Sequence, residues 1–278
     1  MTDSRSPLAR RTEWAGLSRP LLVAALAVAL AGCSSTPKED PNSTQAVERL
    51  YADAKDDMNN GGWEAAIKKM ERVEGRAAGT LLAQQATLDL AYAYHRTNEK
   101  AQALSTLDRF IKLNPSSPAL DYALYLRGIV NFNDNLGILG TLARQELSER
   151  DQQASRDAYQ SFKQLIDQFP QSRYASDARL RMDYIVNALA EYEVHVARYY
   201  FRRGAFVAAA NRAQQAVQEF QQAPANEEAL YIMAASYGRL GLDQLRDDTE
   251  RVLRKNFPNT PYLAQGVRQR ERAWWQLW

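Results

Sequence analysis

Apolar positions recur every three or four residues through most of the chain after Thr44, which is the spacing of an amphipathic α-helix. Short breaks rich in Gly, Asn and Pro interrupt this pattern, and these residues mark helix ends. The pattern predicts helices in pairs, about five hairpins in all. The expected ranges are Thr44–Asn59 with Trp63–Val73, Leu81–Thr97 with Lys100–Leu113, Pro118–Asn135 with Gln152–Gln168, Ser172–Arg203 with Ala205–Phe220, and Asn226–Leu240 with Asp243–Asn256.

Small residues recur at a fixed interval along the first helices of these hairpins. Ala54, Ala91 and Gly128 are 37 residues apart, and so are Ala197 and Ala234. The surrounding residues resemble the tetratricopeptide pattern, as in Leu90-Ala91-x-x-Tyr94 followed by Ala103-x-x-x-Leu107 and Pro115. We therefore expect an all-α fold, a right-handed α-solenoid of about five tetratricopeptide-like hairpins.

Two positions depart from this repeat pattern. Asp57 stands where the first repeat would have its tyrosine, and Arg246 stands where the last repeat would have a small residue. Residues 134–151 break the rhythm and contain Gly137 and Gly140 around an apolar pair, which predicts a loop. That loop is either functional or an insertion that packs on the body.

The N-terminal segment has a different pattern. Arginines precede an apolar run of about 11 residues, Leu21 to Ala31, which is too short to cross a bilayer as a helix. Basic residues, a short apolar run and small residues at its end are typical of a secretory signal peptide. Leu30-Ala31-Gly32-Cys33 resembles the lipobox of bacterial lipoproteins. This resemblance implies that residues 1–32 are removed and that the thiol and the freed amine of Cys33 are acylated.

Cys33 is the one cysteine of the sequence, so it has no disulfide partner within the chain. Several acyl chains would hold it stably, since each buried methylene contributes roughly 0.8 kcal/mol. Ser34 follows the cysteine, and by resemblance to lipoprotein sorting rules this implies the outer membrane, facing the periplasm. The alternative is a chance cysteine after an ordinary signal peptide. Residues 33–43 are polar and contain two prolines, which predicts a flexible tether.

Charge and motif content exclude several functions. The formal net charge is +2, and residues 1–32 carry four arginines and two acids, so the mature chain is neutral. We expect no nucleic-acid partner, because nucleic-acid binding needs a basic face. The chain has two histidines, His95 and His195, and lacks GxSxG, HExxH and a phosphate-binding glycine loop. We therefore expect no catalysis, metal or cofactor, and a lipid-anchored hydrolase is the weakest alternative.

In a solenoid of this kind the first helices line the concave face. Counting from the small residues places ten side chains on that face. They are Tyr51, Lys55, Met58, Leu88, Tyr92, His95, Arg96, Tyr125, Ile129 and Phe132. Aromatic side chains mixed with cations suit a groove for peptides, although we expect about half of these residues to serve packing. The predicted substrate-groove residues are Tyr51, Lys55, Tyr92, His95, Arg96 and Tyr125.

The third to fifth hairpins carry the most specific signal. They contain Phe169-Pro170-Gln171-Ser172-Arg173-Tyr174-Ala175, then Ala197-Arg198-Tyr199-Tyr200, and then Arg203-Gly204-Ala205-Phe206 followed by Asn211-Arg212. With the lipobox and the hairpins, the chain resembles the BamD family (older name ComL) of the β-barrel assembly machinery. The resemblance implies a scaffold in which hairpins 1–3, residues 44–170, recognise unfolded outer-membrane proteins. Hairpins 4–5, residues 171–258, would contact the POTRA region of BamA and accessory lipoproteins.

By the family's pattern, an interface role is expected for Arg212 and Asn211, and more loosely for Arg203. The planar fork of arginine can hold a carboxylate through two hydrogen bonds. The alternative for Arg203 is that it caps a helix end beside Gly204. Residues 259–278 form a basic and aromatic tail without an assigned role. An alternative function with the same lipobox and solenoid is an adaptor for peptidoglycan synthesis or cell division.

If the lipobox is processed, the mature chain should begin at Cys33 and carry the additional mass of its acyl groups. Intact-mass spectrometry of protein purified from detergent-solubilised membranes measures both properties. Cys33→Ala should abolish the lipid, whereas the control Ser34→Ala keeps the thiol and should still be acylated. A mature chain that begins elsewhere, or that has the mass of bare polypeptide, would contradict this prediction.

Overall fold

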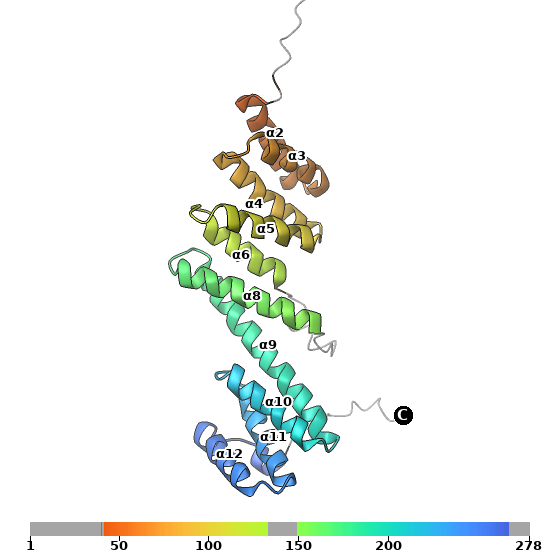
Figure 1. Cartoon of the computed structure of the whole chain (residues 1–278), viewed down its shortest axis with the longest axis vertical. Coiled ribbons are helices and arrows are strands. Elements are labelled where there is room, and N and C mark those ends of the chain that lie inside the picture. Colours follow the sequence, from red (N-terminus) through yellow and green to blue (C-terminus); the bar gives the residue numbers. More distant parts are fainter. Residues whose placement is uncertain (1–39, 41, 133–148, 267–278) are drawn as a thin grey trace, which may run out of the picture. The chain divides into compact units, whose positions relative to one another are not determined.

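A computed structural model describes residues 40, 42–132 and 149–266 of the chain (Figure 1). The chain divides into a unit of residues 1–49 and a larger unit of residues 50–278. Of the first unit, the structure describes residues 40 and 42–49, which include the start of helix α2 (Thr44–Asn59). The remaining helices belong to the second unit.

The described part of the second unit consists of helices joined by turns, without β-strands. After α2 come α3 (Trp63–Arg76), α4 (Leu81–Arg96), α5 (Lys100–Leu113), α6 (Leu120–Asn131), α8 (Glu149–Gln168), α9 (Ala175–Arg202), α10 (Phe206–Glu219), α11 (Asn226–Arg239), α12 (Asp243–Asn256) and α13 (Tyr262–Gln265). The all-α class is confirmed, and the predicted helices are all present. The short helix α13 was not predicted, because one turn of helix has too little periodic pattern to detect.

Helices that follow one another in sequence pack together from α3 to α12. In addition, α4 packs on α6 and α9 packs on α11, so that first helices of consecutive hairpins are in contact. This arrangement, in which each hairpin buries its apolar face against the next one, is that of tetratricopeptide-like repeats. The succession of hairpins in Figure 1 therefore follows the order predicted from the sequence.

The turns inside hairpins 1, 2, 4 and 5 share one backbone conformation. Gly61, Gly204 and Gly241 have φ values of 78°, 78° and 73°, in the left-handed region that glycine enters without steric cost. In the second hairpin Asn98 occupies the same position with φ 63°. Asparagine is one of the few other residues that adopt this conformation, because its short side chain forms local hydrogen bonds. The turn geometry is thus kept although the residue changes.

The regularly spaced small residues are buried between the packed helices. Ala54, Ala91 and Ala197 are fully buried, and Ala234 is 2% exposed. Gly128 of α6 faces the ring of Phe162 on α8, and a Cβ atom added to Gly128 would lie 2.3 Å from that ring. The ring of Phe162, itself fully buried, therefore occupies the space that a larger residue would need.

The long helix α9 takes part in two hydrophobic clusters. Ile185 and Leu189 near its middle belong to one cluster with Phe162 of α8. Val194 and Ala197 in its second half pack with α10 and α11. The core therefore continues across residue 170, and α9 is the element that joins hairpins 1–3 to hairpins 4–5.

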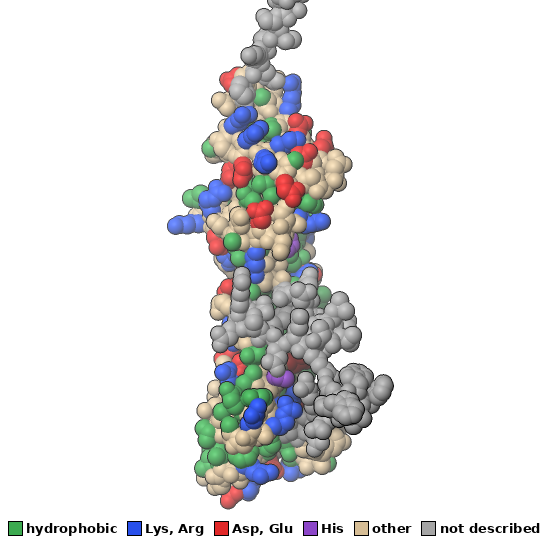
Figure 2. Space-filling model, turned by 90° about the vertical axis from the view of Figure 1, so that its right-hand side faces the viewer, with side chains coloured by type: hydrophobic (Ala, Val, Ile, Leu, Met, Phe, Trp, Pro, Cys, Tyr) green, Lys and Arg blue, Asp and Glu red, His purple; other side chains and the backbone are tan. Residues whose placement is uncertain are grey.

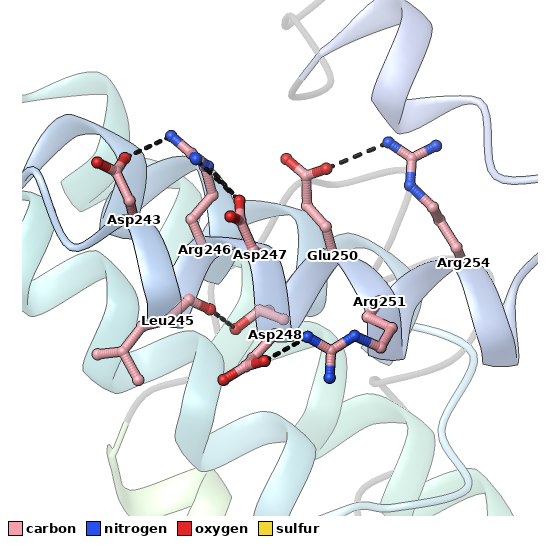
Figure 3. Close-up of polar contacts among 9 residues, drawn as sticks. Asp243, Leu245, Arg246, Asp247, Asp248, Glu250, Arg251 and Arg254 are labelled. Atoms are coloured by element: carbon pink, nitrogen blue, oxygen red, sulfur yellow. Dashed lines mark hydrogen bonds and ion pairs between the residues drawn. The ribbon is translucent and has the colours of Figure 1, made fainter.

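Ion pairs join neighbouring turns of α12 on its exposed surface (Figure 3). Arg246 pairs with Asp243 at 2.6 Å, Arg251 with Asp248 at 2.6 Å, and Arg254 with Glu250 at 3.1 Å. Arg246 replaces the small residue of the repeat pattern, and its stem packs over Gly238 of α11, which has no side chain to obstruct it. A charged outer face is expected of the helix that closes a repeat array.

Replacing Gly128 with Ala should destabilise the fold by about 1 to 3 kcal/mol, since the new methyl group would overlap the Phe162 ring. Urea unfolding followed by circular dichroism measures this change. Gly75→Ala in α3 is the control, because no heavy atom lies within 4 Å of its added Cβ. This control should be stabilising by about 0.5 to 1 kcal/mol. Equal effects of the two substitutions would contradict the packing argument.

Candidate partner-binding surfaces

Tyr51 and Lys55 of α2 both contact Asp89 of α4. The Tyr51 hydroxyl donates a hydrogen bond to Asp89 Oδ2 at 2.7 Å, and Lys55 Nζ donates to Oδ1 at 3.0 Å. Burial and this hydrogen bond raise the pKa of Tyr51 above its usual range. These two predicted groove residues therefore tie the first helices of hairpins 1 and 2 to each other.

Tyr92, His95 and Arg96 lie together at the end of α4, beside Trp63 of α3. The Arg96 guanidinium is 4.5 Å from the centre of the Trp63 ring and donates a hydrogen bond to the Tyr92 hydroxyl at 3.0 Å. Tyr92 also packs edge to face on Trp63, with ring centres 5.8 Å apart. The predicted residues are thus brought into one aromatic and cationic cluster.

Tyr125 of α6 makes the contact in hairpin 3 that Tyr51 makes in hairpin 1. Its hydroxyl donates to Asp177 Oδ2 of α9 at 2.7 Å, and Arg181 Nε donates to the same oxygen at 2.6 Å. Burial raises the pKa of Asp177, but the hydrogen bonds from Arg181 and Tyr125 outweigh it, so the pKa lies below its ordinary value. Tyr125 also stacks on Tyr174, with ring centres 4.7 Å apart.

The other residues counted onto this face have mixed roles. Met58 and Leu88 are 7% and 5% exposed, so they are core residues and the expectation that they line a groove was wrong for them. Ile129 and Phe132 are partly buried and pack against the core. The aspartates that hold the tyrosines could not be predicted from the sequence, because a lone aspartate on a helix gives no sign of a partner in the next hairpin.

Arg212 on α10 is paired with Glu193 on α9. Its Nη1 atom lies 3.0 Å from Glu193 Oε2, and the side chain of Glu193 is 3% exposed whereas that of Arg212 is 42% exposed. Arg212 therefore stabilises a buried carboxylate and still presents part of its guanidinium to solvent. A substitution that removes its positive charge would leave Glu193 buried without compensation.

A second buried carboxylate, Glu228 on α11, has a more complete set of partners. Arg198 of α9 donates to it through Nε at 2.6 Å and Nη2 at 2.7 Å, and the Tyr262 hydroxyl lies 3.3 Å away. The side chains of Arg198 and Glu228 are 19% and 6% exposed. This network joins α9, α11 and α13, and no sequence pattern predicted it.

Arg203 and Asn211 lie at the turn end of hairpin 4. The Arg203 guanidinium is 5.2 Å from the centre of the Tyr199 ring, and its backbone N–H bonds to the last carbonyls of α9. Asn211 lines a shallow depression of about 470 Å³ together with Phe206, Val207 and Leu240. Val207 is 60% exposed, and Figure 2 shows hydrophobic surface near the C-terminal hairpins.

Several predicted features lie outside the described residues: the segment 1–32, Cys33, most of the loop 134–151, and residues 267–278 with the tail's arginines and tryptophans. Within the described ranges, none of the helices is long and apolar enough to cross a bilayer. The same ranges contain no cluster of His, Cys, Asp and Glu suited to holding a metal ion.

Comparison with known proteins gives consistent results. A family model described as an outer membrane lipoprotein, YfiO, matches residues 43–253. The outer membrane protein assembly factor BamD of Neisseria meningitidis serogroup B is 44% identical, covering 94% of this chain and 100% of the relative. BamD of Xylella fastidiosa strain Temecula1 is 34% identical over 85% and 80% of the two chains. BamD of Vibrio cholerae is 34% identical, covering 82% of this chain and 93% of the relative.

Two solved structures show a weak similarity to this chain. A Podosopora anserina putative kinesin light chain with TPR-like repeats is 15% identical, covers 81% of this chain and 98% of its own, and has a TM-score of 0.35. BtubC from P. vanneervenii is 16% identical, covers 93% of this chain and 96% of its own, and has a TM-score of 0.30.

Asp177 should make stability depend on pH in the acid range. Because its folded-state pKa is below the ordinary 3.8, its stabilising contribution is present above that pH and is lost as the pH falls further. Asp177→Asn should therefore lower the unfolding free energy near neutral pH by about 0.5 to 1 kcal/mol, and by less near the acid limit of folding. Urea titrations across this range, with exposed Asp183→Asn as control, measure the difference. A deficit that is constant with pH would contradict the assignment.

Proposed function

The chain belongs to the BamD family of outer membrane lipoproteins, and on this basis we propose that it is a scaffold of the β-barrel assembly complex. In this role it binds unfolded outer-membrane proteins and the POTRA region of BamA, with accessory lipoproteins as further partners. The family match carries the proposal, because it extends over residues 43–253 and so includes both sets of candidate residues.

The anchor follows from the N-terminal sequence. Acyl groups on Cys33 hold the protein at the periplasmic face of the outer membrane, and residues 33–43 connect them to the helices. Fixing the scaffold at the membrane raises the local concentration of its partners at the place where barrels insert. The protein acts by binding alone and performs no catalysis.

Hairpins 1–3 are the proposed site for unfolded substrates. The exposed parts of Tyr92, His95 and Arg96, beside Trp63, form a surface that stacks against aromatic side chains and donates hydrogen bonds to carbonyl or carboxylate oxygens. Tyr51, Lys55 and Tyr125 extend this surface along the first helices. Because their polar groups are bonded to aspartates, a substrate contacts mainly their ring faces and stems.

The turn end of hairpin 4 is the proposed BamA surface. Arg203, Asn211 and Arg212 supply hydrogen-bond donors beside the exposed apolar residues Val207 and Leu240. A protein interface of this composition has an apolar centre and arginine at its margin. The unoccupied donors favour a partner segment that carries carboxylates.

Charge reversal at Arg203 tests the BamA surface. Arg203→Glu should weaken binding of the purified POTRA region of BamA by at least about tenfold, since a cation at the interface becomes an anion. Arg203 is preferable to Arg212 for this purpose, because a glutamate at position 212 would face buried Glu193 and disturb folding. Isothermal titration calorimetry gives the affinity, and circular dichroism confirms the fold.

The matched control is Arg251→Glu, which reverses a charge on the outer face of α12, where the arginine side chain is 75% exposed. Its affinity for the POTRA region should equal that of the unchanged protein. Equal affinities of the Arg203 and Arg251 variants would argue against the turn end of hairpin 4 as the BamA surface.

A further inference from the structure

Hairpins 4 and 5 contain two buried glutamates that are paired with arginine in different ways. Glu228 receives two hydrogen bonds from Arg198, and both side chains are largely shielded from solvent, with 6% and 19% exposed. That guanidinium has two of its five N–H groups committed to one carboxylate. Such a pair serves to hold α9 against α11.

Glu193 and Arg212 form an ion pair in which only the arginine is exposed to solvent. The carboxylate of Glu193 is 3% exposed, and in the described part of the chain Arg212 is the cation that compensates it. Arg212 uses one N–H of Nη1 for this contact and keeps 42% of its side chain in solvent. The pair ties α9 to α10 and at the same time leaves part of the guanidinium open to a partner.

The buried carboxylate restricts the motion of an otherwise mobile side chain. A free arginine on a helix surface samples many rotamers, and ordering it at an interface costs free energy. The ion pair with Glu193 imposes much of that order before a partner arrives. The edges of the guanidinium plane point in different directions, so one edge can hold Glu193 while another meets a second carboxylate.

We propose that Glu193 is a positioning residue for partner binding: it holds Arg212 so that the unused N–H groups of the guanidinium face a carboxylate of the docking protein. This inference rests on the proposed function, which places a partner on hairpin 4. Arg203 provides a contrast within the same hairpin. Its guanidinium lies over the exposed ring of Tyr199, a contact weaker than the ion pair of Arg212. The side chain of Arg203 is therefore free to change conformation when a partner binds, whereas that of Arg212 is already oriented.

A double-mutant cycle tests the positioning role. Glu193→Gln removes the charge but keeps the shape and an acceptor oxygen, and Arg212→Gln removes the guanidinium. Affinity for the purified POTRA region of BamA is measured for the four combinations, at a temperature where circular dichroism shows each to be folded. With Arg212 present, Glu193→Gln should weaken binding about threefold to tenfold. With Gln at position 212, it should change the affinity less than about twofold.

The control is Glu228→Gln, which removes the charge of the other buried carboxylate and should leave the affinity unchanged. A general loosening of hairpins 4 and 5 would weaken binding in both backgrounds and in the control, and either result would overturn the inference. If Glu193→Gln proves unfolded, Glu193→Asp keeps the charge and withdraws the carboxylate by one methylene. This variant should also weaken binding of the POTRA region, as Glu193→Gln does, and an unchanged affinity would count against positioning.

The outcomes separate this inference from the proposed function. If the unchanged protein does not bind the POTRA region, the proposed function itself fails. If it binds, but Arg212→Gln has no effect, the positioning role is overturned while a partner surface on hairpin 4 remains. If Arg212→Gln weakens binding and Glu193→Gln does so equally in both backgrounds, only the role of Glu193 is lost.

Discussion

The close approach of the paired helices is the constraint on which the rest of the structure depends. Ala54, Ala91 and Ala197 are fully buried, and a Cβ atom added to Gly128 would overlap the ring of Phe162. Phe162 shows the other half of this arrangement, since its ring fills the space left by Gly128. The resulting stack decides which side chains of the first helices come together, and hence where the candidate surfaces lie.

On the first helices, this stacking places a tyrosine hydroxyl opposite an aspartate of a following hairpin. The contact occurs between Tyr51 and Asp89 and again between Tyr125 and Asp177, each time with a cation on the same aspartate. A surface made in this way is rigid, because its polar groups are satisfied internally. Residues of this face therefore serve both the fold and a groove, and the two roles need not be alternatives.

In the C-terminal hairpins, buried carboxylates also affect both the fold and the surface that a partner meets. Burying a carboxylate is costly unless a cation accompanies it, so Glu193 and Glu228 each demand an arginine. Arg198 is itself largely buried where it pairs with Glu228, whereas Arg212 pairs with Glu193 from the protein surface. The fold thus determines which arginine is available to a partner. On α12, by contrast, exposed pairs between neighbouring turns keep the end of the array soluble and contribute little stability.

The sequence by itself determined the helices other than α13, their pairing and the positions of the buried small residues. Periodic apolar residues, turn residues such as Asn98 and the 37-residue spacing are local or regularly repeated signals, so they can be read without coordinates. Only the tertiary structure decided that Met58 and Leu88 belong to the core, that Asp89 and Asp177 hold the tyrosines, and that Glu193 and Glu228 are buried. These facts depend on contacts between helices, formed by residues about 20 to 50 positions apart in sequence, and a small rotation of one helix changes which side chain faces inward. The partner of a lone charged residue on a helix is set by that rotation, and no pattern within the helix records it.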